Sequence, residues 1–315
     1  EASIIALALR KTLETENKTA ALVTPDRSLA RRVTAELLRW NIHIDDSAGR
    51  PLFNTPPGVF FRQCVQVASK TATPIAYLSL LKHPYSTAGM TPSKFRELVR
   101  RLEITLFRRP KYRHEGTKLE KTMKKTAKGM TNELEKFVVR VEKIIRPFSQ
   151  IFEYKHASFK TLLTAHVQMA ETLATDQSQN NSTLLWSGDD GEALALFFSE
   201  LNEVSDSLGL IPTRQYSSLI DTLLRPQVHR PSFGRHPRLH IWGPLEARLQ
   251  QVNLMILGGL NENSWPAEIP TNPWMSRQMM EKFGISEPER RLGLSAHDFT
   301  QAACAEEVML TRSTR

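Results

Sequence analysis

The sequence predicts an α/β fold into which a large helical domain is inserted, and three observations lead to this prediction. Two short apolar runs, at residues 239–242 and 252–257, are bounded by Gly and Pro, as is typical of strands buried on both faces of a parallel sheet. A strand, a helix and a strand with short connections occupy residues 20–44, which indicates a parallel pair joined by a crossover. The pattern between these segments is helical. The expected domains are an α/β domain at 1–73 and 237–315 and an inserted helical domain at 74–236.

The first α/β segment contains a clear helix-start signal. Thr24 is expected to cap the helix, Pro25 suits the first turn, and Asp26 favours the positive end of the helix dipole. An apolar face then continues to Trp40. The elements expected in this segment are a helix at 3–13, a strand at 20–23, a helix through Trp40, a strand at 42–44 and a helix at 57–70.

The inserted segment consists of amphipathic helices. The strongest pattern lies at residues 132–152, where apolar residues keep a 3.6-residue spacing without a break. Residues 175–190 are rich in Gln, Asn, Ser and Asp and are expected to form a surface loop. The expected helices are 75–82, 92–107, 132–152, 159–173, 192–208 and 213–224.

The last α/β segment begins with the two apolar runs. Gly258 and Gly259 end the second run, and the polar loop 261–266 then lies at the carboxyl end of a strand. In open α/β sheets this edge is where ligands and partner domains meet the fold. Helices are expected at 275–283 and 289–302 and a strand at 308–311. Because that strand ends the chain without a cap, we expect the sequence to be part of a longer protein.

Composition restricts the class of protein. The chain has 315 residues, 40% of them hydrophobic and 24% charged, which is ordinary for a globular protein and enough for two domains. No apolar run approaches the roughly 20 residues that cross a bilayer, and the N-terminus does not resemble a cleavable signal. Cys64 and Cys304 are far apart, so neither a disulfide framework nor a metal site is indicated. We therefore expect a cytoplasmic protein with no membrane partner and no bound metal.

A net charge of +9 indicates a polyanionic partner, with DNA as the first candidate. Basic residues concentrate at 94–128, where long cationic side chains suit sequence-independent phosphate contacts. The candidate DNA-binding residues are Arg100, Arg101, Arg108, Arg109, Lys111, Arg113, Lys121, Lys124 and Lys125. The alternative is a solvated helix face that binds nothing, and Phe95 and Phe107 fit better as core residues than as base-stacking side chains.

The sequence offers little for catalysis. No G-x-x-x-x-G-K-[ST] motif occurs, so there is no phosphate loop and no Ser or Thr to hold magnesium. Cys64 is expected to be a small core residue. Asp45 and Asp46 are expected to begin a loop through hydrogen bonds to the backbone. His297 and Asp298 make a poor site, because adjacent helical residues point in different directions. No catalytic residue is assigned.

Four groups of residues near the two ends of the chain form a recognisable set. They are Thr24-Pro25-Asp26-Arg27 with Ala30-Arg31-Arg32, Asp45-Asp46-Ser47-Ala48-Gly49, Gly259-Leu260-Asn261-Glu262 with Trp265-Pro266, and Pro288-Glu289-Arg290-Arg291-Leu292 with Ala296-His297-Asp298-Phe299. Together they resemble the C-terminal motor domain of UvrD-like superfamily 1 helicases. The closer likeness is to the B subunits of alphaproteobacterial AddAB helicase-nucleases, a family that repairs double-strand breaks. The resemblance implies a RecA-like, P-loop NTPase-type motor domain with an accessory helical domain inserted at the helical block.

The resemblance also assigns helicase-motif positions, some of which depart from the family pattern. The positions are Arg27, Glu246, Asn261, Glu262, Glu289, Arg290, Arg291 and Gln301. Such helicases place an arginine that faces the γ-phosphate in the last helix, where Gln301 stands here. A lysine expected before the turn that contains Glu246 is replaced by Trp242. Both departures imply a motor fold that no longer hydrolyses ATP.

The family implies partners and cofactors beyond this chain. It implies binding and scanning of DNA and assembly with the A helicase-nuclease subunit. No cofactor is expected in this chain, whereas ATP with magnesium and an iron-sulfur cluster are expected in the parent complex. Two other functions stay open: the C-terminal half of an active ATP-dependent DNA helicase, and a basic helical interaction module with no nucleic-acid role.

Overall fold

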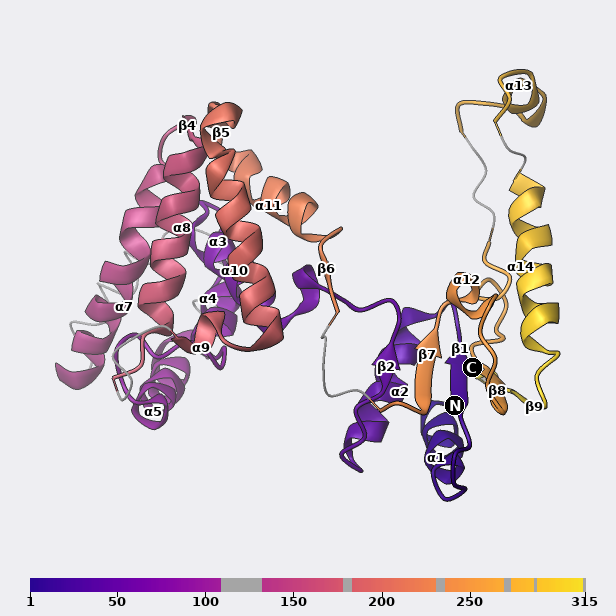
Figure 1. Ribbon diagram of the computed structural model, residues 1–315. Coiled ribbons are helices and arrows are strands. Elements are labelled where there is room, and N and C mark those ends of the chain that lie inside the picture. The colour runs from indigo at the N-terminus through magenta and orange to yellow at the C-terminus, as the bar shows by residue number, and fades with distance from the viewer. Residues whose placement is uncertain (109–131, 178–182, 231–235, 269–272, 286–287, 314–315) are drawn as a thin grey trace. The chain divides into compact units, whose positions relative to one another are not determined.

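The computed structural model describes residues 1–108, 132–177, 183–230, 236–268, 273–285 and 288–313. Its chain divides into two compact units (Figure 1). The sheet unit comprises Glu1–Gly49 and Arg230–Arg315, and the helical unit comprises Arg50–His229. The fold class is therefore α/β, with a parallel-sheet unit assembled from two segments that the helical unit separates in sequence.

Five parallel strands form the sheet, in the order β2-β7-β1-β8-β9. The strands are β1 (Ala20–Val23), β2 (Asp45–Asp46), β7 (Leu239–Trp242), β8 (Leu254–Leu257) and β9 (Glu307–Leu310). The helices of the sheet unit are α1 (Ala2–Thr12), α2 (Arg27–Leu38), α12 (Pro244–Ala247), α13 (Arg277–Lys282) and α14 (Pro288–Ala302). Ala20 and Leu22 pack with α1 and α2, whereas Ala21 and Val23 pack with α12 and α14. This alternation buries β1 on both faces, as its unbroken apolar run predicts.

Strand β2 differs from the sequence-based expectation. A strand was expected at 42–44, paired with the strand at 20–23. Instead β2 consists of Asp45 and Asp46 and pairs with β7, which lies between β1 and β2. Because β7 follows the helical unit in sequence, the local pattern of residues 20–46 cannot show that another strand lies between β1 and β2.

The helical unit contains a long helix at the strongest predicted position. Its helices are α3 (Pro56–Ala68), α4 (Pro74–Leu81), α5 (Pro92–Leu102), α7 (Asn132–Ile151), α8 (Phe159–Ala174), α9 (Thr183–Trp186), α10 (Gly188–Glu203) and α11 (Tyr216–Leu224). It also contains two short antiparallel pairs that the helical pattern did not predict, β3 (Arg50–Pro51) with β6 (Val228–His229) and β4 (His156–Ser158) with β5 (Leu210–Pro212). Within the described part of the chain, no helix combines the length and apolar character that crossing a membrane requires.

Helix α3 belongs to the helical unit. Phe60, Phe61 and Cys64 are completely buried in the core that α3 shares with α7, α8, α10 and α11. The division therefore falls at Gly49 and Arg230, whereas residues 73 and 237 were expected from the sequence. An apolar helix face does not reveal which neighbours will cover it. Burial raises the pKa of the Cys64 thiol, in keeping with a core role for this residue.

A hydrogen-bonded histidine lies in the same core. His166 is completely buried, with Nε2 2.8 Å from the Phe61 carbonyl oxygen and Nδ1 3.1 Å from the Tyr216 hydroxyl. A carbonyl oxygen can only accept, so Nε2 carries the proton and Nδ1 accepts from Tyr216. Burial lowers the pKa of His166 to about 4, and burial likewise lowers the pKa of His83 to about 4.

We predict that residues 50–229 fold alone and that a fragment beginning at residue 74 does not. The shorter fragment lacks Phe60 and Phe61, whose loss would leave large cavities in the core. Thermal melting followed by circular dichroism should give one cooperative transition for 50–229. A cooperative transition of equal midpoint in the shorter fragment would contradict this assignment of α3.

We also predict that the helical unit loses stability as the pH falls from about 6.5 towards 4. His166 has a lower pKa folded than unfolded, so the unfolded chain binds the extra proton, and the stability present above pH 6.5 is lost on acidification. The slope from one such group approaches about 1.4 kcal/mol per pH unit. Urea unfolding at several pH values should show a shallower dependence for His166→Gln than for the natural sequence. An equal pH dependence of stability in the two proteins would show that a group other than His166 takes up the proton.

Candidate functional site

The loops that follow the parallel strands lie along one edge of the sheet, here called the carboxyl edge. Because all five strands run in the same direction, every strand contributes its carboxyl end to this edge. Ligands of open α/β sheets bind at this position. The residues that follow the strands are Thr24, Ser47, Gly243, Gly258 and Thr311.

The turn after β1 is fixed by short-range hydrogen bonds. Thr24 is completely buried, and its Oγ1 accepts from the Asp26 N–H at 3.1 Å. Asp26 Oδ1 accepts from the N–H groups of Ser28 at 2.7 Å and Leu29 at 3.2 Å. Asp26 is therefore the N-cap and α2 begins at Arg27, so the expectation that Thr24 caps this helix is wrong.

Arg27 joins the start of α2 to the end of β2. Its Nη2 donates to Asp46 Oδ2 in a partly exposed ion pair, and Asp46 Oδ1 accepts from the Ala48 N–H at 3.1 Å. The second contact confirms that Asp46 begins the loop through a bond to the backbone. Arg27 Nη1 and Ser47 Oγ are buried and have no hydrogen-bond partner in the described structure. Arg27 thus acts first as a link between two loops of the carboxyl edge.

The two glycines after β8 permit a close approach of that strand to its neighbours. A Cβ atom at Gly258 would lie 2.7 Å from Leu22 Cδ1, and Gly259 has a φ of +75°. The Gly259 N–H donates to Glu1 Oε1 at 2.8 Å, and the same oxygen accepts from Thr311 Oγ1 at 2.9 Å. These contacts hold the loops after β8 and β9 together.

Asn261 and Trp265 anchor the next part of the loop. Asn261 Oδ1 accepts from the Ser313 N–H at 3.0 Å, and its carbonyl oxygen accepts from the Trp265 N–H at 3.3 Å. The Trp265 ring is buried edge-on against Phe299 of α14, with centroids 5.8 Å apart. Glu262 is exposed. The loop is therefore held by packing and backbone bonds, with Glu262 facing solvent.

Gln301 lies away from these loops. Its Nε2 donates to the Arg248 carbonyl oxygen, and it lines a cavity of about 660 Å³ together with Thr19 and Asn253, the residues just before β1 and β8. These residues mark the amino edge of the sheet, opposite the loops that carry Arg27 and Asn261. Gln301 therefore does not join the other motif positions in one site.

The remaining motif positions lie in the short helix α12 and at the start of α14. Glu246 is exposed, and its carboxylate stands over Gly243, where a Cβ atom would lie 2.4 Å from Oε2. Arg290 and Arg291 are exposed at the start of α14. The Glu289 side chain lies outside the described part of the structure.

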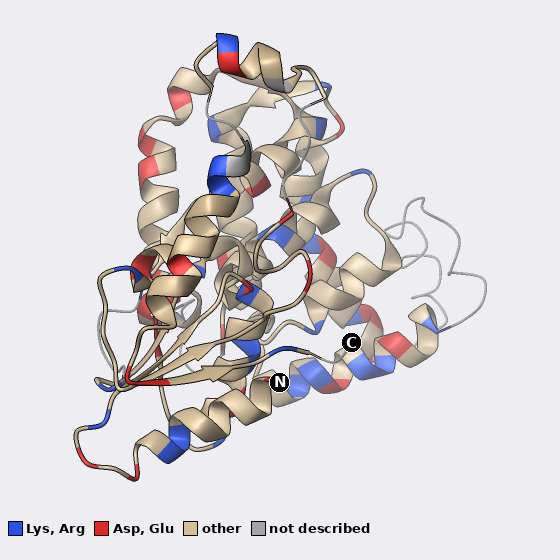
Figure 2. Ribbon diagram, turned by 90° about the vertical axis from the view of Figure 1, so that its right-hand side faces the viewer, with Lys and Arg blue, Asp and Glu red and all other residues tan. Residues whose placement is uncertain are grey.

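The basic stretch at 94–128 is partly neutralised where it is described. Arg101 Nη1 lies 2.7 Å from Glu133 Oε2 and 3.6 Å from Glu97 Oε1, and Arg108 Nη2 lies 3.2 Å from Glu103 Oε1. Basic and acidic positions are interspersed along the described helices (Figure 2). The candidates outside the described residues are Arg109, Lys111, Arg113, Lys121, Lys124 and Lys125.

Arg100, another candidate DNA-binding residue, lies exposed on α5. It forms no ion pair with any residue in the described ranges. By contrast, the Lys94 ammonium and the Arg101 guanidinium hold the pKa of Glu133 below its usual value. Phe95 is completely buried and Phe107 packs against the core, which confirms the core role expected for both.

Comparisons with protein-family models and with curated proteins identified no relative of this chain. No group of three or more His, Cys, Asp or Glu side chains in the described ranges is arranged to hold a metal ion.

We predict that Gly259→Ala lowers the free energy of unfolding by about 1–2 kcal/mol, because a side chain at positive φ is strained. Gly293→Ala provides a matched control, since its new Cβ meets no atom within 4 Å and Ala is favoured inside a helix. Chemical denaturation should show destabilisation by the first change and slight stabilisation by the second. Equal effects would contradict the tight turn after β8.

Proposed function

We propose that this chain is an ATPase-silent, helicase-like part of the B subunit of a DNA double-strand break repair helicase-nuclease. Its role would be to bind and scan DNA and to form a scaffold for the complex with the A subunit. The observation that carries the proposal is the division of one parallel sheet by a helical unit, with β1 and β2 before the unit and β7, β8 and β9 after it. The resembled helicases carry an accessory helical domain inserted in this way, and motif residues Arg27 and Asn261 follow strands at the carboxyl edge.

Two residues support the loss of ATP hydrolysis. Trp242 stands where the family has a lysine, and its ring is buried and stacks on His240 with centroids 5.2 Å apart. Such a residue packs a core and cannot neutralise a phosphate. Gln301 stands where the family has an arginine, yet it binds the Arg248 carbonyl oxygen at the amino edge. Neither position supplies a cation at the carboxyl edge of the sheet.

We predict that the chain does not hydrolyse ATP and that Gln301→Arg does not create activity. An arginine that stabilises phosphoryl transfer contributes about 10³ to 10⁵ in rate, but only when it reaches the γ-phosphate. In the resembled helicases the other motor half carries the phosphate loop, so ATP turnover should be measured for both proteins with and without that half. Turnover by the natural sequence joined to that half would favour an active helicase over the silent one.

We predict that the chain binds single- and double-stranded DNA weakly, without sequence preference and with strong salt dependence. Phosphate contacts release counterions, so affinity should fall steeply as salt rises. Arg96→Glu with Arg100→Glu removes two exposed cations of α5 and should weaken binding at least about tenfold. Fluorescence anisotropy over a salt series measures both effects.

The matched control for this prediction is Lys11→Glu with Lys282→Glu, which changes the net charge equally at two exposed positions of the sheet unit. An affinity that ignores salt would contradict DNA binding through phosphates. Equal weakening by the control pair would show that overall charge, rather than α5, determines binding.

A further inference from the structure

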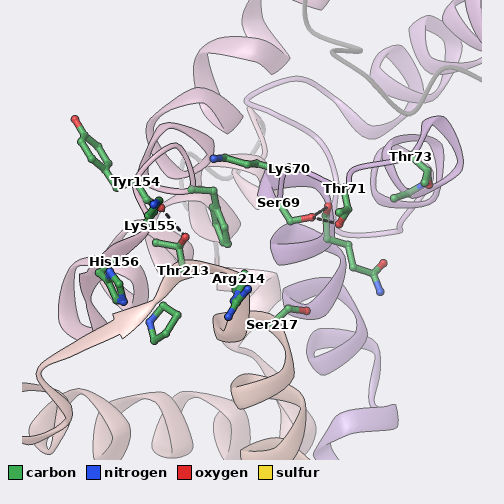
Figure 3. Close-up of a pocket in the computed structure, with 14 residues that line it drawn as sticks. Ser69, Lys70, Thr71, Thr73, Tyr154, Lys155, His156, Thr213, Arg214 and Ser217 are labelled. Carbon is green, nitrogen blue, oxygen red and sulfur yellow. Dashed lines mark hydrogen bonds between the residues drawn. The ribbon is translucent and has the colours of Figure 1, made fainter.

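A basic pocket of about 860 Å³ lies within the helical unit. It is formed where the end of α3, the end of α7, the β4–β5 pair and the start of α11 meet (Figure 3). Lys70, Lys155 and Arg214 line it, and no Asp or Glu is among the fourteen residues that form its wall. None of these cations belongs to the basic stretch at 94–128.

The backbone that carries two of these cations is tied in place. Thr213 is buried, its Oγ1 donates to the Tyr154 carbonyl oxygen at 2.7 Å, and its N–H donates to the Lys155 carbonyl oxygen at 3.0 Å. Pairing of His156 with Pro212 continues this connection. Lys155 directly precedes β4 and Arg214 lies two residues after β5, so these contacts fix the backbone of both cations beside the β4–β5 pair.

The positive charge of the pocket is not neutralised locally. Lys70, Lys155 and Arg214 are exposed, and none forms an ion pair with a carboxylate in the described part of the chain. Lys160 shows the contrast, because its Nζ lies 2.7 Å from Asp206 Oδ2. Lys70 Nζ donates to the Glu153 carbonyl oxygen at 3.3 Å, which leaves two of its three N–H groups for a ligand.

The rest of the wall offers hydroxyl groups and an aromatic ring. Ser69, Thr71 and Ser217 lie along it, and the buried Phe152 contributes an apolar surface. Tyr154 is 69% exposed, and its ring extends outward at the rim (Figure 3). A planar group bound at this rim would meet a free aromatic face.

We propose that this pocket binds a phosphomonoester attached to a nucleoside. Three cations around one pocket suit a dianion, the guanidinium of Arg214 can form paired hydrogen bonds to two phosphate oxygens, and bases stack on exposed tyrosines. A free nucleoside monophosphate and the 5′-phosphorylated end of a single DNA strand share this chemistry. The inference does not depend on the helicase-like function proposed above, since its residues are separate from α5 and from the carboxyl edge.

Calorimetric titration of the whole chain tests this pocket with three probes: thymidine 5′-monophosphate, a short single-stranded oligonucleotide with a 5′-phosphate, and the same oligonucleotide with a 5′-hydroxyl. We expect the 5′-phosphate to strengthen oligonucleotide binding at least about tenfold, the loss typical of one missing charge-assisted contact. Tighter binding of the phosphorylated oligonucleotide than of the monophosphate identifies a strand end as the ligand, and equal binding identifies the free nucleotide.

Variants locate the binding in the pocket. Lys155→Gln and Arg214→Gln should each abolish the preference for the 5′-phosphate, while Lys160→Gln, an equal change of charge five residues from Lys155, should keep it. Tyr154→Ala should weaken nucleotide binding and Tyr154→Phe should restore it. All these positions are exposed, so thermal midpoints should stay unchanged. The variant Arg96→Glu with Arg100→Glu should keep the preference for the 5′-phosphate, because both residues lie outside the pocket. Equal affinity for the phosphate and hydroxyl oligonucleotides would overturn the proposal. An unchanged preference in Arg214→Gln would overturn it as well.

Discussion

The sheet unit depends on the pairing of strands that are distant in sequence. β7 follows the helical unit, yet it occupies the place between β1 and β2, with Leu239 opposite Ala20. Closing a connection as long as the helical unit would cost conformational entropy if that connection were unfolded. The first and last residues of the helical unit pair with each other instead, Arg50 with His229 and Pro51 with Val228. A folded helical unit therefore returns the chain beside its starting point, so the sheet forms as though the connection were short.

Much of this architecture can be predicted from the local pattern of apolar residues in the sequence. Runs such as Ala20–Val23 and Leu254–Leu257 are apolar at every position because both sheet faces are covered, and α7 repeats its apolar residues at helical spacing. Strand order is not readable, because it depends on pairing between segments on either side of the helical unit. The same limit explains α3, whose apolar face fits a sheet or a helical core equally well until Phe60 and Phe61 are seen among α7, α8, α10 and α11. The pair β4–β5 is too short, at three residues a strand, for periodicity to show.

The candidate site was predicted less completely than the fold. Motif residues identified the loops of the carboxyl edge, but their contacts are structural: Arg27 binds Asp46, Asn261 binds the backbone of Ser313, and Trp265 packs on Phe299. Spacing along α14 could not show that Gln301 lies at the amino edge, because that depends on how the helix runs across the sheet. These contacts connect the loops of the parallel sheet to one another, and the positions at which the resemblance implies a lysine and an arginine hold Trp242 and Gln301.

The distribution of charge explains why sequence clusters and surface sites differ. In the described part of the basic stretch at 94–128, acidic residues lie three or four positions from the basic ones on the same helix, or on the facing helix. Arg101 therefore forms ion pairs with Glu97 and with Glu133. Much of the charge that a sequence cluster suggests is thereby cancelled. Lys70, Lys155 and Arg214 come from three distant segments and form no cluster in the sequence, yet the fold brings them to one pocket whose wall contains no carboxylate. The affinity of a site for an anionic ligand depends on the positive charge that no nearby carboxylate neutralises, more than on the number of cations. A cation that already pairs with a carboxylate must break that ion pair before it can bind a phosphate.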